Sequence, residues 1–166
     1  MRVLLFLLVL SLCGPVSSMA YQPWSESVFL DVRKRFGQQA EKRYRYLHQL
    51  ILDNQNLPTM KKLILVNNTM NHLPWIADAV HWKKADYWAS PMETITTFGG
   101  DCEDIAIAKW IMLRHLGIPK ENLRLAYVKI RKSGEAHMVL IYVDKLDLPK
   151  EQWQVLVLDN YIAEIR

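Results

Sequence analysis

The hydrophobic pattern of this chain changes its period once, and that change limits the folds that the chain can adopt. Before Gly117-Ile118-Pro119, apolar residues recur every three or four positions, which is typical of amphipathic helices. After these residues, short runs rich in Val, Ile, Leu and Tyr are separated by polar turns, which is typical of β-strands. Helices followed by consecutive strands predict an α+β domain, in which the helices pack on a small antiparallel sheet.

The same pattern predicts where the individual elements lie. The first helical face consists of residues spaced three or four apart, namely Val28, Val32, Phe36, Ala40, Tyr44 and Leu47. Gly37 falls within this face and is a candidate break between two helices. Further helices are expected over residues 59–71 and from Cys102 to about Leu116, while residues 73–98 are irregular, as in a packed loop with a short helix. Strands are expected over residues 123–131, 137–143 and 154–159, joined as an antiparallel meander.

The first twenty residues have the composition of a secretory signal peptide. Arg2 precedes the apolar residues 3–12, Gly14-Pro15 follows them, and Ser18 and Ala20 are small residues at the positions that signal peptidase reads. The apolar run is too short to span a bilayer comfortably. We therefore expect cleavage after Ala20, export, and a mature single domain over residues 21–166. A rival interpretation, a lipoprotein anchored through Cys13, is disfavoured because Leu12 is larger than the residue that lipoprotein processing requires.

Composition and charge exclude several classes of protein. Hydrophobic residues make up 51% of the chain and charged residues 23%, so the chain is not disordered. The net charge of +4 arises largely in one helical segment, where basic residues are best explained as a solvated helix face. Because the protein is expected to be exported, nucleic acid is not an expected partner. If Cys13 leaves with the signal peptide, Cys102 is alone and has no intramolecular disulfide partner.

Cys102 is a candidate nucleophile because of the segment that surrounds it. Gly99-Gly100-Asp101 precedes it and an apolar helical pattern follows it, which places Cys102 in the first turn of a helix. There the free backbone N–H groups and the positive end of the helix dipole favour a thiolate, the reactive form of cysteine. The alternative is a buried, inert thiol.

A cysteine nucleophile needs a base, and His137 is the best candidate among five histidines. It opens a predicted strand just after a turn, where a side chain can face a cleft, whereas the other four are expected to be surface or packing residues. Asp159 closes the next predicted strand. In an antiparallel pair the end of one strand lies beside the start of its neighbour, so Asp159 can orient His137. Such a pair is structural about as often as it is catalytic.

Three carboxylates lie next to Cys102 in the sequence, at Asp101, Glu103 and Asp104. Acids in a first helical turn stabilise the helix through its dipole, and this is their default explanation. They also oppose ionisation of the thiol, unless they are paired or a cation neutralises them. A cluster of oxygen ligands suits Ca²⁺ better than zinc, so a calcium site is a candidate here.

Segments along nearly the whole mature chain resemble the bacterial transglutaminase-like cysteine peptidases of the LapG type. Residues 62–68 (KLILVNN) resemble the helix motif of the family, and residues 86–93 (DYWASPME) resemble its lead-in to the active site. Residues 99–109 (GGDCEDIAIAK) match its signature. Residues 136–140 (AHMVL) and 157–160 (VLDN) supply the other two corners of the family's site.

The resemblance implies a papain/transglutaminase-like fold, a Cys102–His137–Asp159 triad, and calcium held by Asp101, Glu103 and Asp104. It also implies a periplasmic endopeptidase that cleaves the N-terminal region of large surface adhesins at di-alanine-type sites and so releases biofilm cells. The implied partner is an inner-membrane cyclic di-GMP receptor of the LapD type, which sequesters the protease. Family members usually continue beyond the point where this chain stops, seven residues after Asp159, so the C-terminal end of the domain is expected to be truncated.

Two other functions stay open at this point. The same residues would serve a transglutaminase-like acyl transferase, because an amine can resolve a thioester as well as water can. A catalytically inactive module that binds an adhesin or a receptor is the third possibility, and the intact triad residues argue against it. For a protease, Trp88 is expected to line the substrate groove, and Asn68 or Asn71 is a candidate second donor to the oxyanion hole.

Overall fold

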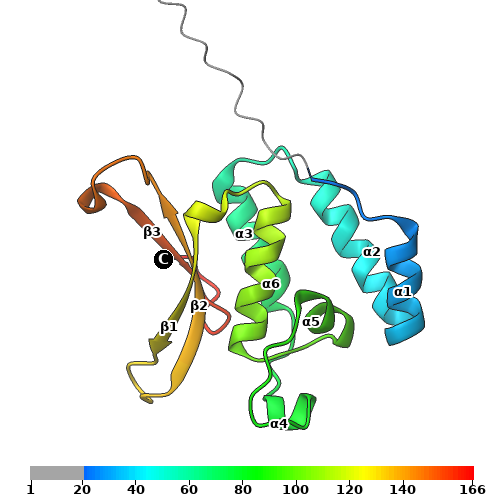
Figure 1. Cartoon of the computed structure of the whole chain (residues 1–166). Helices are drawn as coiled ribbons and strands as arrows, with labels where there is room; N and C mark the ends of the chain where they lie inside the picture. The colour runs from blue at the N-terminus through cyan, green and yellow to red at the C-terminus, as the bar shows by residue number, and fades with distance from the viewer. Residues whose placement is uncertain (1–20) are drawn as a thin grey trace, which may run out of the picture.

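The computed structural model describes residues 21–166 as helices on one side of a small sheet (Figure 1). The expected signal peptide and Cys13 lie outside the described residues. The helices are α1 (Glu26–Phe36), α2 (Gln38–Asp53), α3 (Thr59–Asn71), α4 (Asp78–His81), α5 (Pro91–Thr97) and α6 (Cys102–His115), with two short 3₁₀ turns, η1 (Lys120–Asn122) and η2 (Lys150–Gln152). The strands are β1 (Leu123–Lys129), β2 (Ala136–Asp144) and β3 (Gln154–Leu158).

The long N-terminal helical face is divided at Gly37, as the sequence predicted. Gly37 has a φ of 87°, a left-handed conformation that costs glycine little, and its N–H donates to the carbonyl of Arg33. The chain therefore turns between α1 and α2, which pack against each other. The helix α3 has the bounds that the sequence predicted.

Residues 73–98 contain two short helices rather than one. The second, α5, has a complete capping box, in which the Ser90 hydroxyl accepts from the Glu93 N–H and the Glu93 carboxylate accepts from the Ser90 N–H. Pro91 occupies the first helical position, where its missing N–H costs nothing. Phe98 ends α5 in the left-handed conformation, with a φ of 61°.

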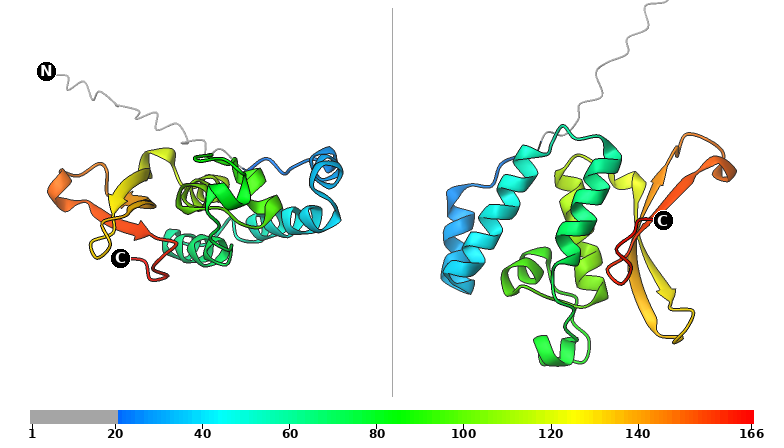
Figure 2. Two further views of the ribbon diagram at one scale, coloured as in Figure 1. Left: turned by 90° about the horizontal axis from the view of Figure 1, so that it is seen from below. Right: turned by 180° about the vertical axis from the view of Figure 1, so that it is seen from behind.

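The three strands form an antiparallel meander in the order β1-β2-β3. The register pairs Val128 with His137 and Leu140 with Leu158, so the start of β2 and the end of β3 lie at the same end of the sheet. The helix α6 packs on β2, and α3 and α5 pack on α6. The views from below and from behind agree that the sheet and the α1–α2 pair lie on opposite sides of α6 (Figure 2).

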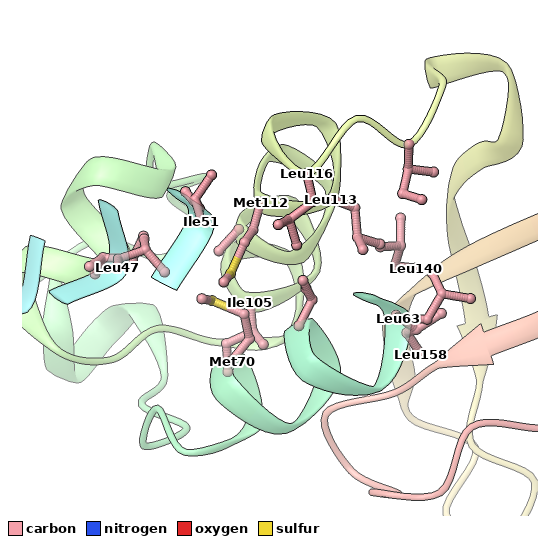
Figure 3. Packing of buried hydrophobic residues seen from close by; sticks show 14 of the residues in the cluster. Leu47, Ile51, Leu63, Met70, Ile105, Met112, Leu113, Leu116, Leu140 and Leu158 are labelled. Atoms are coloured by element: carbon pink, nitrogen blue, oxygen red, sulfur yellow. The ribbon is translucent and has the colours of Figure 1, made fainter. Parts of the chain in front are cut away.

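The hydrophobic core joins the helices to the sheet through α6. Leu63 of α3, Leu113 of α6, Leu140 of β2 and Leu158 of β3 are completely buried and lie in one cluster (Figure 3). Burial of this apolar surface fixes α6 between its neighbours, and its first residue, Cys102, is held in place as a result. None of the helices formed by residues 21–166 combines the length and apolar character that a membrane span requires.

Candidate active site

The segment before α6 is held in place by backbone pairing. Gly100 forms an isolated bridge with Trp75, in which the Gly100 N–H donates to the Pro74 carbonyl and the Ile76 N–H donates to the Gly100 carbonyl. Asp101 then occupies the N-cap position, but its side chain makes no capping hydrogen bond. Cys102 is the first residue of the helix, as expected.

Cys102 is a free cysteine, and its surroundings stabilise the protonated form of the thiol. Its Sγ donates to Oε2 of Glu103 across 2.9 Å. Burial, and then Glu103, raise the pKa of Cys102 to about 12, while the backbone N–H of Met138 acts in the opposite direction. Burial and the carboxylates oppose the thiolate that the helix terminus alone was expected to favour.

His137 and Asp159 lie together at one end of the sheet, as the strand pairing predicted. The Nε2 atom of His137 is 2.8 Å from Oδ1 of Asp159, and both side chains are largely buried. The strand β3 ends at Leu158, one residue before the strand end expected from the sequence, so Asp159 directly follows the strand. Its Oδ1 also accepts from the backbone N–H of Tyr161, which fixes the carboxylate in a turn.

Cys102 approaches this pair from the helix side. The N–H of Met138 that acts on the sulfur belongs to the residue after His137, so the thiol lies beside the start of β2. Since Nε2 of His137 is bound to Asp159, Nδ1 is the ring nitrogen that has no hydrogen-bond partner among residues 21–166. The structure thus pairs His137 with Asp159, leaves one imidazole nitrogen free, and places the Cys102 sulfur near the backbone of Met138, the residue after His137.

A buried acidic cluster lies next to Cys102. Oδ1 of Asp78, Oδ1 of Asp101 and Oδ2 of Asp104 are buried and have no hydrogen-bond partner among the described residues. The other carboxylate oxygens of Asp78 and Asp104 accept from the backbone N–H groups of Tyr87 and Ala89. Hydrogen bonds therefore fix two of these carboxylates, while each of the three presents an unpaired oxygen.

The donor set of this cluster fits a divalent cation that prefers oxygen. One group of ligand atoms within 4.8 Å of one another comes from Asp78, Asp101 and Asp104, and another comes from Asp78, Asp86 and Glu103. The pKa of Asp101 is raised to about 8, mainly by burial and next by the neighbouring Glu103. Burial also raises the pKa of Asp104. Buried carboxylates that lack a donor are costly, and a cation held by oxygen ligands removes that cost.

Sequence reasoning missed Asp78, which completes this cluster. It is 5% exposed and lies in the short helix α4, far from Asp101 in the sequence. The surrounding residues showed no periodicity, so only the tertiary fold places Asp78 beside the predicted ligands. The excess of Asp in residues 73–98 was the single available signal.

Two tryptophans are exposed in the segments that pair with residues around Cys102. Trp88 is 55% exposed and Trp75 is 61% exposed, and Trp75 pairs with Gly100 just before α6. Trp82 and Tyr87 are partly buried and contact each other. The aromatic residues therefore divide into packing residues and exposed ones, and Trp88 belongs to the exposed group, as expected for a groove wall.

The asparagines that were candidates for the oxyanion hole have other contacts. The Asn71 amide donates to the backbone carbonyl of Asp159. Asn68 lines an apolar groove of about 770 Å³ between α2 and α3, which contains none of the residues of the site described above. The other histidines also bind elsewhere: His48 contacts Tyr21, His72 contacts the Asn68 carbonyl, His81 contacts Thr97, and His115 packs on Trp24.

Comparisons with known proteins find a family and solved structures to which this chain is similar. The sequence profile of a family described as bacterial transglutaminase-like cysteine proteinase BTLCP matches residues 31–166. The calcium-bound structure of LapG from Legionella pneumophila is similar, with 30% identity and a TM-score of 0.70 over 86% of this chain and 76% of that chain. The EGTA-treated form of the same protein is similar to the same degree and is covered over 74% of its length. No curated protein sequence matches.

Proposed function

The chain belongs to the bacterial transglutaminase-like cysteine proteinases, and on that basis we propose that it is a calcium-dependent endopeptidase with a Cys102–His137–Asp159 triad. The observation that carries the proposal is the hydrogen bond between His137 Nε2 and Asp159 Oδ1, which leaves Nδ1 of His137 free to act as a base. A base held in this way by a carboxylate is the arrangement that cysteine nucleophiles use.

In the proposed reaction, Nδ1 of His137 takes the proton from Cys102 Sγ as the sulfur attacks the carbonyl carbon of a peptide bond. A C–S bond forms and the C–N bond breaks, and the imidazolium returns the proton to the leaving amine. Water then hydrolyses the thioester, with His137 again acting as the base. Asp159 keeps the imidazole oriented and stabilises its cation through Nε2.

Calcium is the cation that we assign to the acidic cluster. The calcium-bound LapG structure supports this assignment, and so do the unpaired buried oxygens of Asp78, Asp101 and Asp104. Glu103 adds a further carboxylate, since it forms a second group of neighbouring ligand atoms with Asp78 and Asp86. The bound ion would neutralise these carboxylates and so stabilise the turn that carries Cys102.

The proposed substrate is the N-terminal region of a large surface adhesin, cut at a di-alanine-type site so that cells leave a biofilm. The proposed location is the periplasm, and the proposed regulator is an inner-membrane cyclic di-GMP receptor of the LapD type. These three proposals rest on the resemblance of the sequence motifs to the LapG-type peptidases. The exposed rings of Trp75 and Trp88 are suitable walls for a groove that accepts small side chains.

The test is cleavage of a purified adhesin N-terminal fragment by the protein after signal removal. Cys102→Ser should abolish cleavage, and Asp159→Asn should lower kcat/KM by roughly 10²- to 10⁴-fold, because an amide stabilises the imidazolium poorly. EGTA should stop cleavage, Ca²⁺ should restore it, and Mg²⁺ should not. Asp144→Asn, an acid at the far end of β2, is the matched control and should remain active. Cleavage by Cys102→Ser at a rate near that of the wild type would refute the proposal.

A further inference from the structure

The helix α6 buries a lysine that the reaction above does not use. Lys109 is 1% exposed and lies seven residues after Cys102, so it is on nearly the same face of the helix two turns later. Its Nζ donates to Oδ1 of Asn67 across 2.8 Å, and it forms no salt bridge with the described residues. Burial lowers the pKa of Lys109 to about 7, and the charge of Asp159 opposes this shift. A lysine buried at this cost calls for an explanation.

The partner of Lys109 belongs to a pair of asparagines on α3 that hold the turn after β3. Asn67 and Asn71 are four residues apart, so they lie on one face of the helix. The Asn67 Nδ2 donates to the Ala163 carbonyl and the Asn71 Nδ2 donates to the Asp159 carbonyl, each across 2.9 Å. Both ends of residues 159–163 are therefore bound to α3.

Lys109 determines which way the Asn67 amide points. Nζ of Lys109 donates to the Asn67 oxygen, and in its protonated form Lys109 has no lone pair with which to accept from the amide NH₂. The NH₂ group of Asn67 then faces the opposite way, towards the Ala163 carbonyl. Without the lysine, the amide loses the contact that selects this orientation, and the turn loses a fixed donor.

We propose that Lys109 and Asn67 are positioning residues for Asp159, because they hold residues 159–163 so that the carboxylate meets Nε2 of His137. The inference rests on the proposed triad for its catalytic consequence. The relay runs from Lys109 Nζ through the Asn67 amide to the Ala163 carbonyl, and Tyr161, between Asp159 and Ala163, donates its N–H to the Asp159 carboxylate. A misplacement of about 1 Å at this carboxylate would be enough to slow the reaction by about 10²-fold.

Two variants break the relay in opposite chemical ways. Lys109→Met keeps the volume, removes the donor and also removes the cost of burying a charge. Asn67→Asp keeps an acceptor for Lys109, and adds an ion pair, but removes the donor to Ala163. Lys62→Met is the matched control, since Lys62 is a partly buried lysine of α3 whose Nζ donates to the Leu116 carbonyl at the opposite end of α6.

Three measurements are made on each variant of the mature protein: the Tm, the proton resonance of the His137 Nε2–H that is bound to Asp159, and kcat and KM on the adhesin fragment. We expect both relay variants to lose or broaden the resonance and to lower kcat about 10- to 100-fold, with Tm and KM close to those of the wild type. The control should keep the resonance and kcat. If Lys109→Met fails to fold, Asn67→Asp still tests the proposal, because Lys109 keeps a hydrogen-bond partner in that variant.

The proposal is overturned if the variants lower the Tm but keep the resonance and kcat, which would assign Lys109 to packing alone. It is also overturned if kcat falls while the resonance is unchanged, because the effect would then not pass through Asp159. If the wild type does not cleave the fragment, the proposed function fails. The resonance still tests the positioning role in that case, since it reports the His137–Asp159 hydrogen bond without turnover.

Discussion

In the calcium-free protein, the free energy of unfolding should fall as the pH rises from 5 to 8, and Asp101 should cause much of the fall. Its pKa is about 8 in the folded protein, owing to burial and then Glu103, against 3.8 in an unfolded chain. Between these values the folded state keeps a proton that the unfolded state has lost, so the stabilisation is complete below pH 4 and is lost towards pH 8. At ~1.4 kcal/mol per pKa unit the whole shift would amount to ~6 kcal/mol. Because water partly screens Asp101, about 2–3 kcal/mol is expected.

The assay is urea denaturation at pH 5, 6.5 and 8, in EGTA and in saturating calcium, for the wild type and Asp101→Asn. The difference between the two proteins isolates Asp101, because burial lowers the pKa of Lys109 and of His115 and both therefore act in the opposite direction. Calcium should abolish the fall, since it binds the ionised carboxylates of the folded state. In EGTA, the free energy of unfolding of the wild type minus that of Asp101→Asn should fall as the pH rises. A difference that does not change with pH, or that increases with it, would refute the electrostatic reasoning.

Two further predictions concern the same region. In EGTA at pH 7, iodoacetamide should alkylate Cys102 far more slowly than an exposed thiol, because the pKa of Cys102 is about 12. Calcium should increase the rate of alkylation. Equal rates with and without calcium would contradict the role given to the carboxylates around Cys102. Asp78→Asn should weaken calcium binding, measured by titration calorimetry, by about 10-fold, because it removes a charged ligand. The control Asp144→Asn should not change the affinity. Unchanged calcium binding in Asp78→Asn would exclude Asp78 as a ligand.

The sequence was sufficient for the elements whose periodicity is regular. The helix α3 and the order of the strands agree with expectation, because α3 and the central strand β2 have regular apolar patterns and pack on α6. The pairing of His137 with Asp159 followed from antiparallel register alone. The helices in residues 73–98 were harder to predict, because short helices are specified by their capping residues rather than by a repeated apolar face. The capping box of Ser90 and Glu93 was visible in the sequence and would have predicted α5.

The acidic cluster and the state of the thiol could not be predicted to the same extent. Asp78 reaches Asp101 only through the folding of the segment that precedes α6, and no spacing rule relates two residues so far apart. The pKa of Cys102 is the sum of opposing effects, namely the helix terminus on one side and burial with Glu103 on the other. Their signs follow from the sequence, but which one prevails depends on the distances in the fold.

The two glycines before Asp101 explain why Cys102 and the acidic cluster lie side by side. Neither has a positive φ, so what the site requires of them is space. A Cβ at Gly99 would lie 2.6 Å from Cδ1 of Ile76, and a Cβ at Gly100 would lie 2.6 Å from Oδ2 of Asp104. The absence of side chains lets the segment that leads to Asp78 approach the start of α6, and the same approach sets the turn that carries Cys102. A larger residue at Gly100 should therefore disturb the thiol and the carboxylates together, because one backbone contact builds both.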